Sequence, residues 1–162
     1  MDLIVNIAAV PFLVLVFIQD LKYRAIHAVL PLIILLIGLG IFFYYKYSLE
    51  IILYNLLFLA VTFLGLYMYL FFKFKKFINP FQKTIGLGDI LFFISVIPFF
   101  TTHNYILFFI TGLIFSLIAF MGLKLFTKTN LVPLAGFLAL YMIGLKILSL
   151  SVGVDFFFNT IL

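Results

Sequence analysis

Six long apolar runs, separated by short polar connections, constrain this chain more than any other feature. The runs cover residues 3–19, 28–45, 51–72, 85–100, 105–123 and 131–150. At about 1.5 Å per residue, runs of this length cross a hydrocarbon core of roughly 30 Å once their flanks are included. The chain is 67% hydrophobic and 9% charged, and a soluble domain of 162 residues cannot hide that much apolar surface. We therefore expect an all-α polytopic membrane protein, a bundle of six transmembrane helices.

The connections are too short to hold a second domain, so residues 1–162 are expected to form one transmembrane domain in the lipid bilayer. The chain has no cysteine, which excludes disulfides, thiolate nucleophiles and cysteine-ligated metal centres. Its two histidines, His27 and His103, fall on opposite sides of the predicted bundle, so we expect no metal site. The net charge of +5 comes from basic residues scattered through the connections, which indicates membrane topology and not nucleic-acid binding.

The basic residues divide the connections into two kinds. Of the ten, eight lie in the first, third and fifth connections, and only Lys46 and Lys146 lie elsewhere. The eight are Lys22, Arg24, Lys73, Lys75, Lys76, Lys83, Lys124 and Lys128. By the positive-inside rule these three connections are cytoplasmic, which puts both termini outside the cytoplasm of an inner (plasma) membrane protein.

The stretch Gly86-Leu-Gly-Asp89 is the strongest functional candidate. The fourth run is short, and to span the bilayer it must include both glycines, which puts Asp89 about one turn inside the membrane. Acidic residues in such positions are costly and are functional candidates by default. Gly86 and Gly88 carry no Cβ, so another segment or a substrate backbone can come close to them.

One other carboxylate occupies a comparable position. Asp20 ends the first, inward-directed run, and Asp89 begins the fourth, outward-directed run, so both are expected at the cytoplasmic face. Two carboxylates close together in a low-dielectric site cannot both ionise easily, and one of them tends to hold a proton. Such a pair can take a proton from water and protonate the carbonyl oxygen under attack, as in aspartic proteases.

Three segments resemble motifs of the type IV prepilin peptidases, a family of GxGD membrane aspartic proteases. Residues 86–89 match the GxGD motif, and residues 20–26 (Asp-Leu-Lys-Tyr-Arg-Ala-Ile) are similar to the family's first-aspartate motif. Residues 131–138, with Pro133 and Gly136, resemble the proline-containing segment that opens the family's last helix. The order and spacing of the three segments extend the resemblance over nearly the whole chain.

The resemblance implies a membrane-embedded aspartic endopeptidase with Asp20 and Asp89 as its catalytic dyad and no metal or organic cofactor. The supporting motif positions are Gly86, Gly88, Pro133 and Gly136. The substrates would be prepilin-like or pseudopilin-like proteins of type IV pili or protein secretion, which lose a basic leader at the cytoplasmic face. The chain is similar to the short, peptidase-only form of the family, which lacks the methylation portion with paired cysteines.

Two positions depart from the family pattern. His27 stands where the family usually has proline, and Leu91 stands where lysine is frequent. These departures leave both aspartates in place and bear on substrate choice and on activity. The sequence leaves open the substrate and its cleavage site, the oligomeric state, and the resting separation of Asp20 and Asp89.

Other readings of the same residues are open. In a small transporter the two aspartates would be ion sites, but such sites are expected near the midplane and in paired broken helices. A non-enzymatic membrane subunit, or an inactive relative, of a filament or secretion system would also carry these motifs. In a purely structural reading, Asp89 pairs with a loop lysine, and Gly86 and Gly88 serve only helix packing.

Two further expectations concern packing. Asn55 and Thr62, both in the third run, are expected to form hydrogen bonds between helices. The apolar tail, residues 151–162, is expected to lie in the membrane interface.

Overall fold

The computed structural model describes residues 8–74, 86–125, 131–152 and 156–158. Over these residues the chain forms six α-helices, one short 3-10 helix and no strand. The elements are α2 (Val10–Tyr23), α3 (Val29–Tyr44), α4 (Leu49–Phe74), α6 (Leu87–Val96), η1 (Ile97–Phe99), α7 (Thr102–Lys124) and α8 (Leu134–Val152). The predicted all-α class is therefore confirmed for the described part of the chain.

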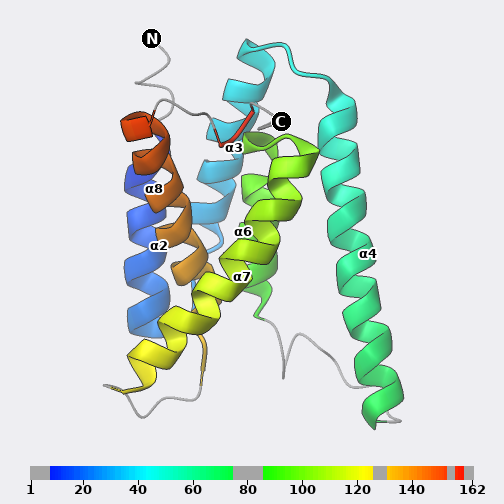
Figure 1. Ribbon diagram of the computed structural model, residues 1–162, viewed down its shortest axis with the longest axis vertical. Helices are drawn as coiled ribbons and strands as arrows, with labels where there is room; N and C mark the ends of the chain where they lie inside the picture. Colours follow the sequence, from blue (N-terminus) through cyan, green and yellow to red (C-terminus); the bar gives the residue numbers. More distant parts are fainter. Residues whose placement is uncertain (1–7, 75–85, 126–130, 153–155, 159–162) are drawn as a thin grey trace.

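The helices run alternately in opposite directions (Figure 1). At the lower end of that view α2, α4 and α7 end, and α3, α6 and α8 begin. Helix α8 packs along α2, α6 packs against α3 and α8, and α4 contacts α7 and η1. One end of the bundle therefore gathers the end of α2 and the starts of α6 and α8, which carry the predicted site residues.

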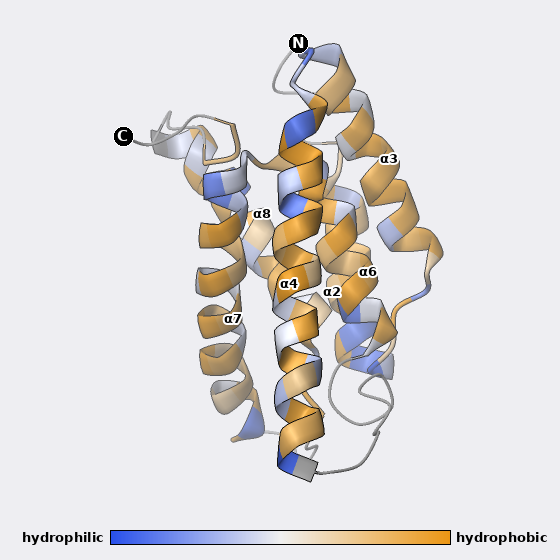
Figure 2. Cartoon of the chain, turned by 90° about the vertical axis from the view of Figure 1, so that its right-hand side faces the viewer, coloured by the Kyte–Doolittle hydropathy of each residue, from blue (hydrophilic) through white to orange (hydrophobic). Residues whose placement is uncertain are grey.

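Among the residues that the structure describes, three helices are long and apolar enough to cross a membrane, over Leu49–Lys73, Thr102–Lys124 and Leu134–Ser151. Two shorter apolar helices cover Val29–Tyr44 and Leu87–Phe99. Hydrophobic residues line α4 and α7 over most of their length, and many of them face outward (Figure 2). An exposed apolar surface of this extent fits contact with lipid, and the composition and the helices together indicate a membrane protein.

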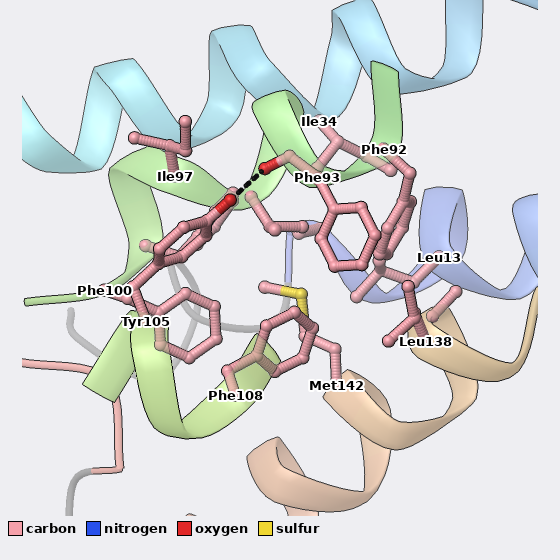
Figure 3. Close-up of a cluster of buried hydrophobic side chains, with 14 of the residues drawn as sticks. Leu13, Ile34, Phe92, Phe93, Ile97, Phe100, Tyr105, Phe108, Leu138 and Met142 are labelled. Carbon is pink, nitrogen blue, oxygen red and sulfur yellow. Dashed lines mark hydrogen bonds between the residues drawn. The ribbon is translucent and has the colours of Figure 1, made fainter. Parts of the chain in front are cut away.

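The short fourth run folds as α6 followed directly by η1. Pro98 has no N–H to continue the α-helical ladder, and the chain tightens there into the 3-10 turn. The hydroxyl of the buried Tyr105 donates to the carbonyl oxygen of Phe93 at 3.0 Å (Figure 3). This bond satisfies one of the last carbonyls of α6, which a helix end leaves without a partner inside the helix.

The centre of the bundle is a cluster of buried aromatic and aliphatic side chains from most of the helices (Figure 3). Its labelled members are Leu13, Ile34, Phe92, Phe93, Ile97, Phe100, Tyr105, Phe108, Leu138 and Met142. Two of these phenylalanines stand on α6, just after Asp89, while Leu13 stands on α2 and Leu138 on α8. The cluster thus fixes the three helices that carry the predicted site.

The two polar residues of α4 behave differently from each other. Asn55 is fully buried, and its Nδ2 donates to the carbonyl oxygen of Phe100 at 3.1 Å, which links α4 to the end of η1. Thr62 instead donates to the carbonyl oxygen of Phe58 in its own helix at 2.8 Å. The expected bond between helices is confirmed for Asn55 and is wrong for Thr62, because a threonine hydroxyl readily reaches the carbonyl four residues earlier.

The described part of the tail, residues 156–158, packs against the bundle. Phe157 is buried, and its ring stacks on Phe100 with 5.0 Å between the ring centroids. Its carbonyl oxygen accepts hydrogen bonds from the Thr101 N–H at 2.9 Å and from Asn104 Nδ2 at 3.2 Å. Phe157 therefore packs onto the start of α7, and the interfacial position of the tail stays a prediction.

Candidate active site: two aspartates on the first turn of α8

Asp20 lies in the last turn of α2, and its side chain is only 6% exposed. The helix continues beyond it to Tyr23 and ends at Arg24, which adopts a left-handed conformation with φ 54°. The Arg24 N–H donates to the Asp20 carbonyl oxygen at 3.0 Å. Asp20 is therefore held inside a regular helical turn, whereas the sequence predicts that the run stops at this residue.

Asp89 lies in the first turn of α6. Its Oδ2 accepts a hydrogen bond from the Gly86 N–H at 3.2 Å, and its own N–H donates to the Gly86 carbonyl oxygen at 3.1 Å. This reciprocal pairing closes the helix start, and a carboxylate there is also favoured by the helix dipole. The GxGD stretch thus presents Asp89 from a capped helix end.

Two neighbouring amides of α8 hold the two carboxyl groups. The Gly136 N–H donates to Asp20 Oδ2 at 2.7 Å, and the Ala135 N–H donates to Asp89 Oδ1 at 2.9 Å. Both amides belong to the first turn of α8, whose N–H groups have no partner inside the helix. The carboxyl groups of Asp20 and Asp89 are also close enough to interact electrostatically. The structure therefore brings the two predicted aspartates together on one helix start.

The predicted glycines all stand in contact with this site. An ideal Cβ on Gly136 would lie 3.2 Å from Asp20 Oδ2, and one on Gly86 would lie 3.2 Å from Asp89 Oδ2. A Cβ on Gly88 would lie 2.6 Å from the Cγ1 atom of Ile26, in the connection between α2 and α3. The close approach expected at glycines therefore involves side chains of this chain itself.

Pro133 is buried directly before α8 begins. Its carbonyl oxygen accepts the Phe137 N–H at 3.1 Å, and a proline at this point is compatible with a helix start because it lacks only an N–H that the helix would not use. Pro133 does not provide a hydrogen bond to either aspartate through its nitrogen. It begins the helical turn in which the Ala135 and Gly136 amides donate to Asp89 and Asp20.

Basic residues surround the same end of the bundle. Among the described residues they are Lys22 and Arg24 at the end of α2, Lys73 near the end of α4, and Lys124 at the end of α7. Arg24 interacts electrostatically with Asp20. The other four predicted cytoplasmic lysines, Lys75, Lys76, Lys83 and Lys128, lie outside the described residues.

Lys146 is one of the two basic residues placed elsewhere by the sequence. It is buried in α8, with Nζ 4.3 Å from the ring centroid of Phe157 and 5.3 Å from that of Phe99. These cation–π contacts join α8 to the tail and to η1 at the end of the bundle away from the aspartates.

Three further residues singled out in the sequence are exposed: His27 and Leu91, which differ from the prepilin peptidase motifs, and His103. The Leu91 side chain is 40% exposed on α6, and His27 follows Ile26 in the connection between α2 and α3. His103 lies at the start of α7, towards the opposite end from the aspartates. Within the described residues, no three histidine, aspartate or glutamate side chains gather as metal ligands would.

The residues that sequence reasoning misses are the amide donors. Ala135 and Gly136 donate to the aspartates through their backbone N–H groups, and a backbone N–H leaves no mark in the sequence.

Comparisons with known protein families, curated proteins and solved structures gave no match to this chain. Its function is therefore inferred from the geometry and chemistry of the site.

Proposed function

We propose that this chain is a membrane-embedded aspartic endopeptidase with Asp20 and Asp89 as its catalytic dyad. The observation that carries the proposal is the pair of carboxyl groups on adjacent amides, with Gly136 N–H on Asp20 Oδ2 and Ala135 N–H on Asp89 Oδ1. These bonds hold one oxygen of each side chain, and Asp89 Oδ2 also accepts the Gly86 N–H at 3.2 Å, so both carboxyl groups have a fixed orientation. Such preorganisation favours proton transfer between the carboxyl groups and a bound water.

In the proposed reaction, a water lies between the two carboxyl groups, which share one proton. The carboxylate takes a proton from this water while the water oxygen bonds to the scissile carbonyl carbon, and the protonated partner gives its proton to the carbonyl oxygen. The tetrahedral intermediate then collapses. The carbon–nitrogen bond breaks as the leaving amine takes a proton from one carboxyl group, and a hydroxyl of the intermediate returns its proton to the other carboxylate, so the dyad again holds one proton. Neither step needs a metal ion or an organic cofactor.

The proposed substrates are prepilin-like or pseudopilin-like proteins, cleaved after a basic leader at the cytoplasmic membrane face. The support for this class is that the three segments resembling prepilin peptidase motifs are the three that meet at the site. Residues 20–26 supply Asp20, residues 86–89 supply Asp89, and residues 131–138 supply the amides. The proposal includes a six-span bundle in the plasma membrane with both termini outside, and the basic residues near the dyad favour a cytoplasmic site.

The test is a co-expression cleavage assay with a prepilin-like substrate from the same genome, read by the intact mass of the product. The variants are Asp20→Asn and Asp89→Asn, because asparagine keeps the shape and a carbonyl acceptor for the α8 amides while losing acid–base chemistry. Glu50→Gln is the matched control, since Glu50 is an exposed carboxylate at the start of α4, at the other end of the bundle.

We expect the wild type and Glu50→Gln to remove the leader, and each aspartate variant to insert into the membrane without cleaving. Cleavage that persists in either aspartate variant would overturn the mechanism. A wild type that leaves a whole panel of leaders intact would instead favour a non-enzymatic membrane subunit.

A further inference from the structure

The connection between α2 and α3 is tied to the turn that carries Asp20. The Arg24 N–H donates to the Asp20 carbonyl oxygen at 3.0 Å, and the left-handed conformation of Arg24 turns the chain sharply there. The His27 N–H donates to the Gln19 side-chain oxygen at 3.2 Å. Ile26 lies between these two attachment points, so its position follows the end of α2.

The side chain of Ile26 faces Gly88 on the neighbouring helix. An ideal Cβ on Gly88 would lie 2.6 Å from Ile26 Cγ1 and 3.2 Å from Cδ1. Cγ1 is the first atom beyond the branch point of a β-branched side chain, whose χ1 angle is stiff, so Ile26 cannot easily swing away. Gly88 directly precedes Asp89, and Ile26 is partly buried against the central cluster. The contact therefore connects the segment that follows Asp20 with the residue that precedes Asp89.

From these contacts we infer that Ile26 is a positioning residue for the aspartate pair. Its side chain, seated against Gly88, sets the distance between the end of α2 and the start of α6, and thereby the approach of Asp89 to Asp20. The inference rests on the proposed function for its consequence in catalysis, but the positioning itself is a property of the fold. In this arrangement the absence of a Cβ on Gly88 leaves room for the Ile26 side chain.

The direction in which Gly88→Ala changes the cleavage rate separates this positioning role from an effect on the local stability of α6. Alanine is more favourable than glycine inside a helix by about 1 kcal/mol, so Gly88→Ala on its own would strengthen the first turn of α6. A loss of cleavage in this variant then comes either from the contact with Ile26 or from a Cβ that blocks the substrate backbone, and shortening Ile26 relieves only the first. Gly38 serves as a matched control for steric strain, because a Cβ there would lie 2.6 Å from Phe99 Cε2, far along the bundle from Asp89.

The first experiment is a size swap in the cleavage assay, with thermal unfolding in detergent measured in parallel. We expect Gly88→Ala to lower the cleavage rate at least about tenfold, since small misplacements of reacting groups are costly. Adding Ile26→Ala to Gly88→Ala restores the missing space and is expected to recover most of the rate. Gly38→Ala is expected to lower the unfolding temperature with a smaller loss of cleavage. If the double variant stays as slow as Gly88→Ala, or if Gly38→Ala loses as much cleavage at the same stability, the inference is overturned.

The second experiment needs no protease activity. The chain has no cysteine, so the pair Asp20→Cys and Asp89→Cys reports alone on the distance between the end of α2 and the start of α6 with a short thiol crosslinker. We expect efficient crosslinking in this background, a loss when Gly88→Ala is added, and recovery when Ile26→Ala is added as well. Crosslinking that follows this pattern while no leader is ever cleaved would support the positioning role and count against the proposed function. If neither Gly88→Ala nor Ile26→Ala changes the crosslinking yield, the positioning role is overturned, whether or not the wild type cleaves a leader.

Discussion

At the scale of the single residue, Gly136 lets the backbone of α8 approach Asp20. An ideal Cβ at this position would lie 3.1 Å from Asp20 Cβ and 3.4 Å from the carbonyl oxygen of Phe17. Neither a Cβ nor a backbone carbonyl can rotate away, so Gly136→Ala is expected to push α8 from α2 and to strain the bond to Asp20. We predict a cleavage rate lowered about tenfold, measured in the same co-expression assay.

The control for this prediction stands in the same helix. Gly144 has nothing within 4 Å of an ideal Cβ, so Gly144→Ala gains the same helix propensity without a collision. It should cleave like the wild type and be at least as stable to heating. A Gly136→Ala variant as active as Gly144→Ala would show that the close approach to Asp20 does not matter for the reaction.

The sequence predicts the side chains of the site better than its backbone donors. Asp20 and Asp89 stand out because the chain has only five carboxylates, and Gly86 and Gly88 stand out because they directly precede one of them. The amide of Ala135 cannot be predicted in this way, since every residue except proline carries an N–H and only the fold selects which ones face a carboxyl group. The contact of Ile26 with Gly88 is hidden for a similar reason, because one isoleucine among so many apolar residues carries no distinguishing signal.

At the scale of the element, α4 depends on one buried amide. Asn55 Nδ2 donates to the Phe100 carbonyl oxygen at 3.1 Å, and α4 contacts the rest of the bundle mainly through α7 and η1. Asn55→Leu, which nearly keeps the volume, should lower the free energy of unfolding by about 0.6 kcal/mol or somewhat more, the usual range for hydrogen bonds between membrane helices. Thr62→Val should change it less, because the Thr62 bond stays within α4. Unfolding by denaturing detergent would measure both, and equal losses would contradict the assignment.

The elements themselves follow from the sequence to different degrees. The apolar run 85–100 and Pro98 predict a short fourth helix, and the chain forms α6 and η1 over nearly that range. The partner of Thr62 and the position of Phe157 are not predicted, because hydropathy shows that a residue is apolar or polar but not which neighbour it meets. Phe157 is buried because it stacks on Phe100 and because its carbonyl oxygen accepts the Thr101 N–H, contacts between segments more than fifty residues apart in the sequence.

At the scale of the whole molecule, the alternation of apolar runs and basic connections predicts that Asp20 and Asp89 lie at the same end, and the helix directions agree (Figure 1). This prediction works because chain direction reverses at every connection, so a simple count of runs is enough. The separation of the aspartates within that end cannot be counted in this way. It depends on how α8 packs along α2 and meets α6, and that packing is set by side-chain contacts and not by hydropathy.

The proposed function requires this end of the bundle to face the cytoplasm, and labelling of single cysteines in intact cells tests it. Tyr23→Cys and Leu125→Cys probe the ends of α2 and α7 near the dyad, and both positions are well exposed. Tyr44→Cys probes the end of α3 and His103→Cys the start of α7, both at the opposite end of the bundle from the dyad. These four substitutions leave every lysine and arginine in place, so the charges that direct topology are unchanged.

A membrane-impermeant thiol reagent should label positions 44 and 103 in intact cells, and positions 23 and 125 only after the membrane is opened. The chain has no cysteine of its own, so the signal has one source in each variant. The opposite pattern would place Asp20 and Asp89 on the outer side. A leader held in the cytoplasm could not then reach the two carboxyl groups, and the proposed substrate class would be wrong even if the pair were catalytic.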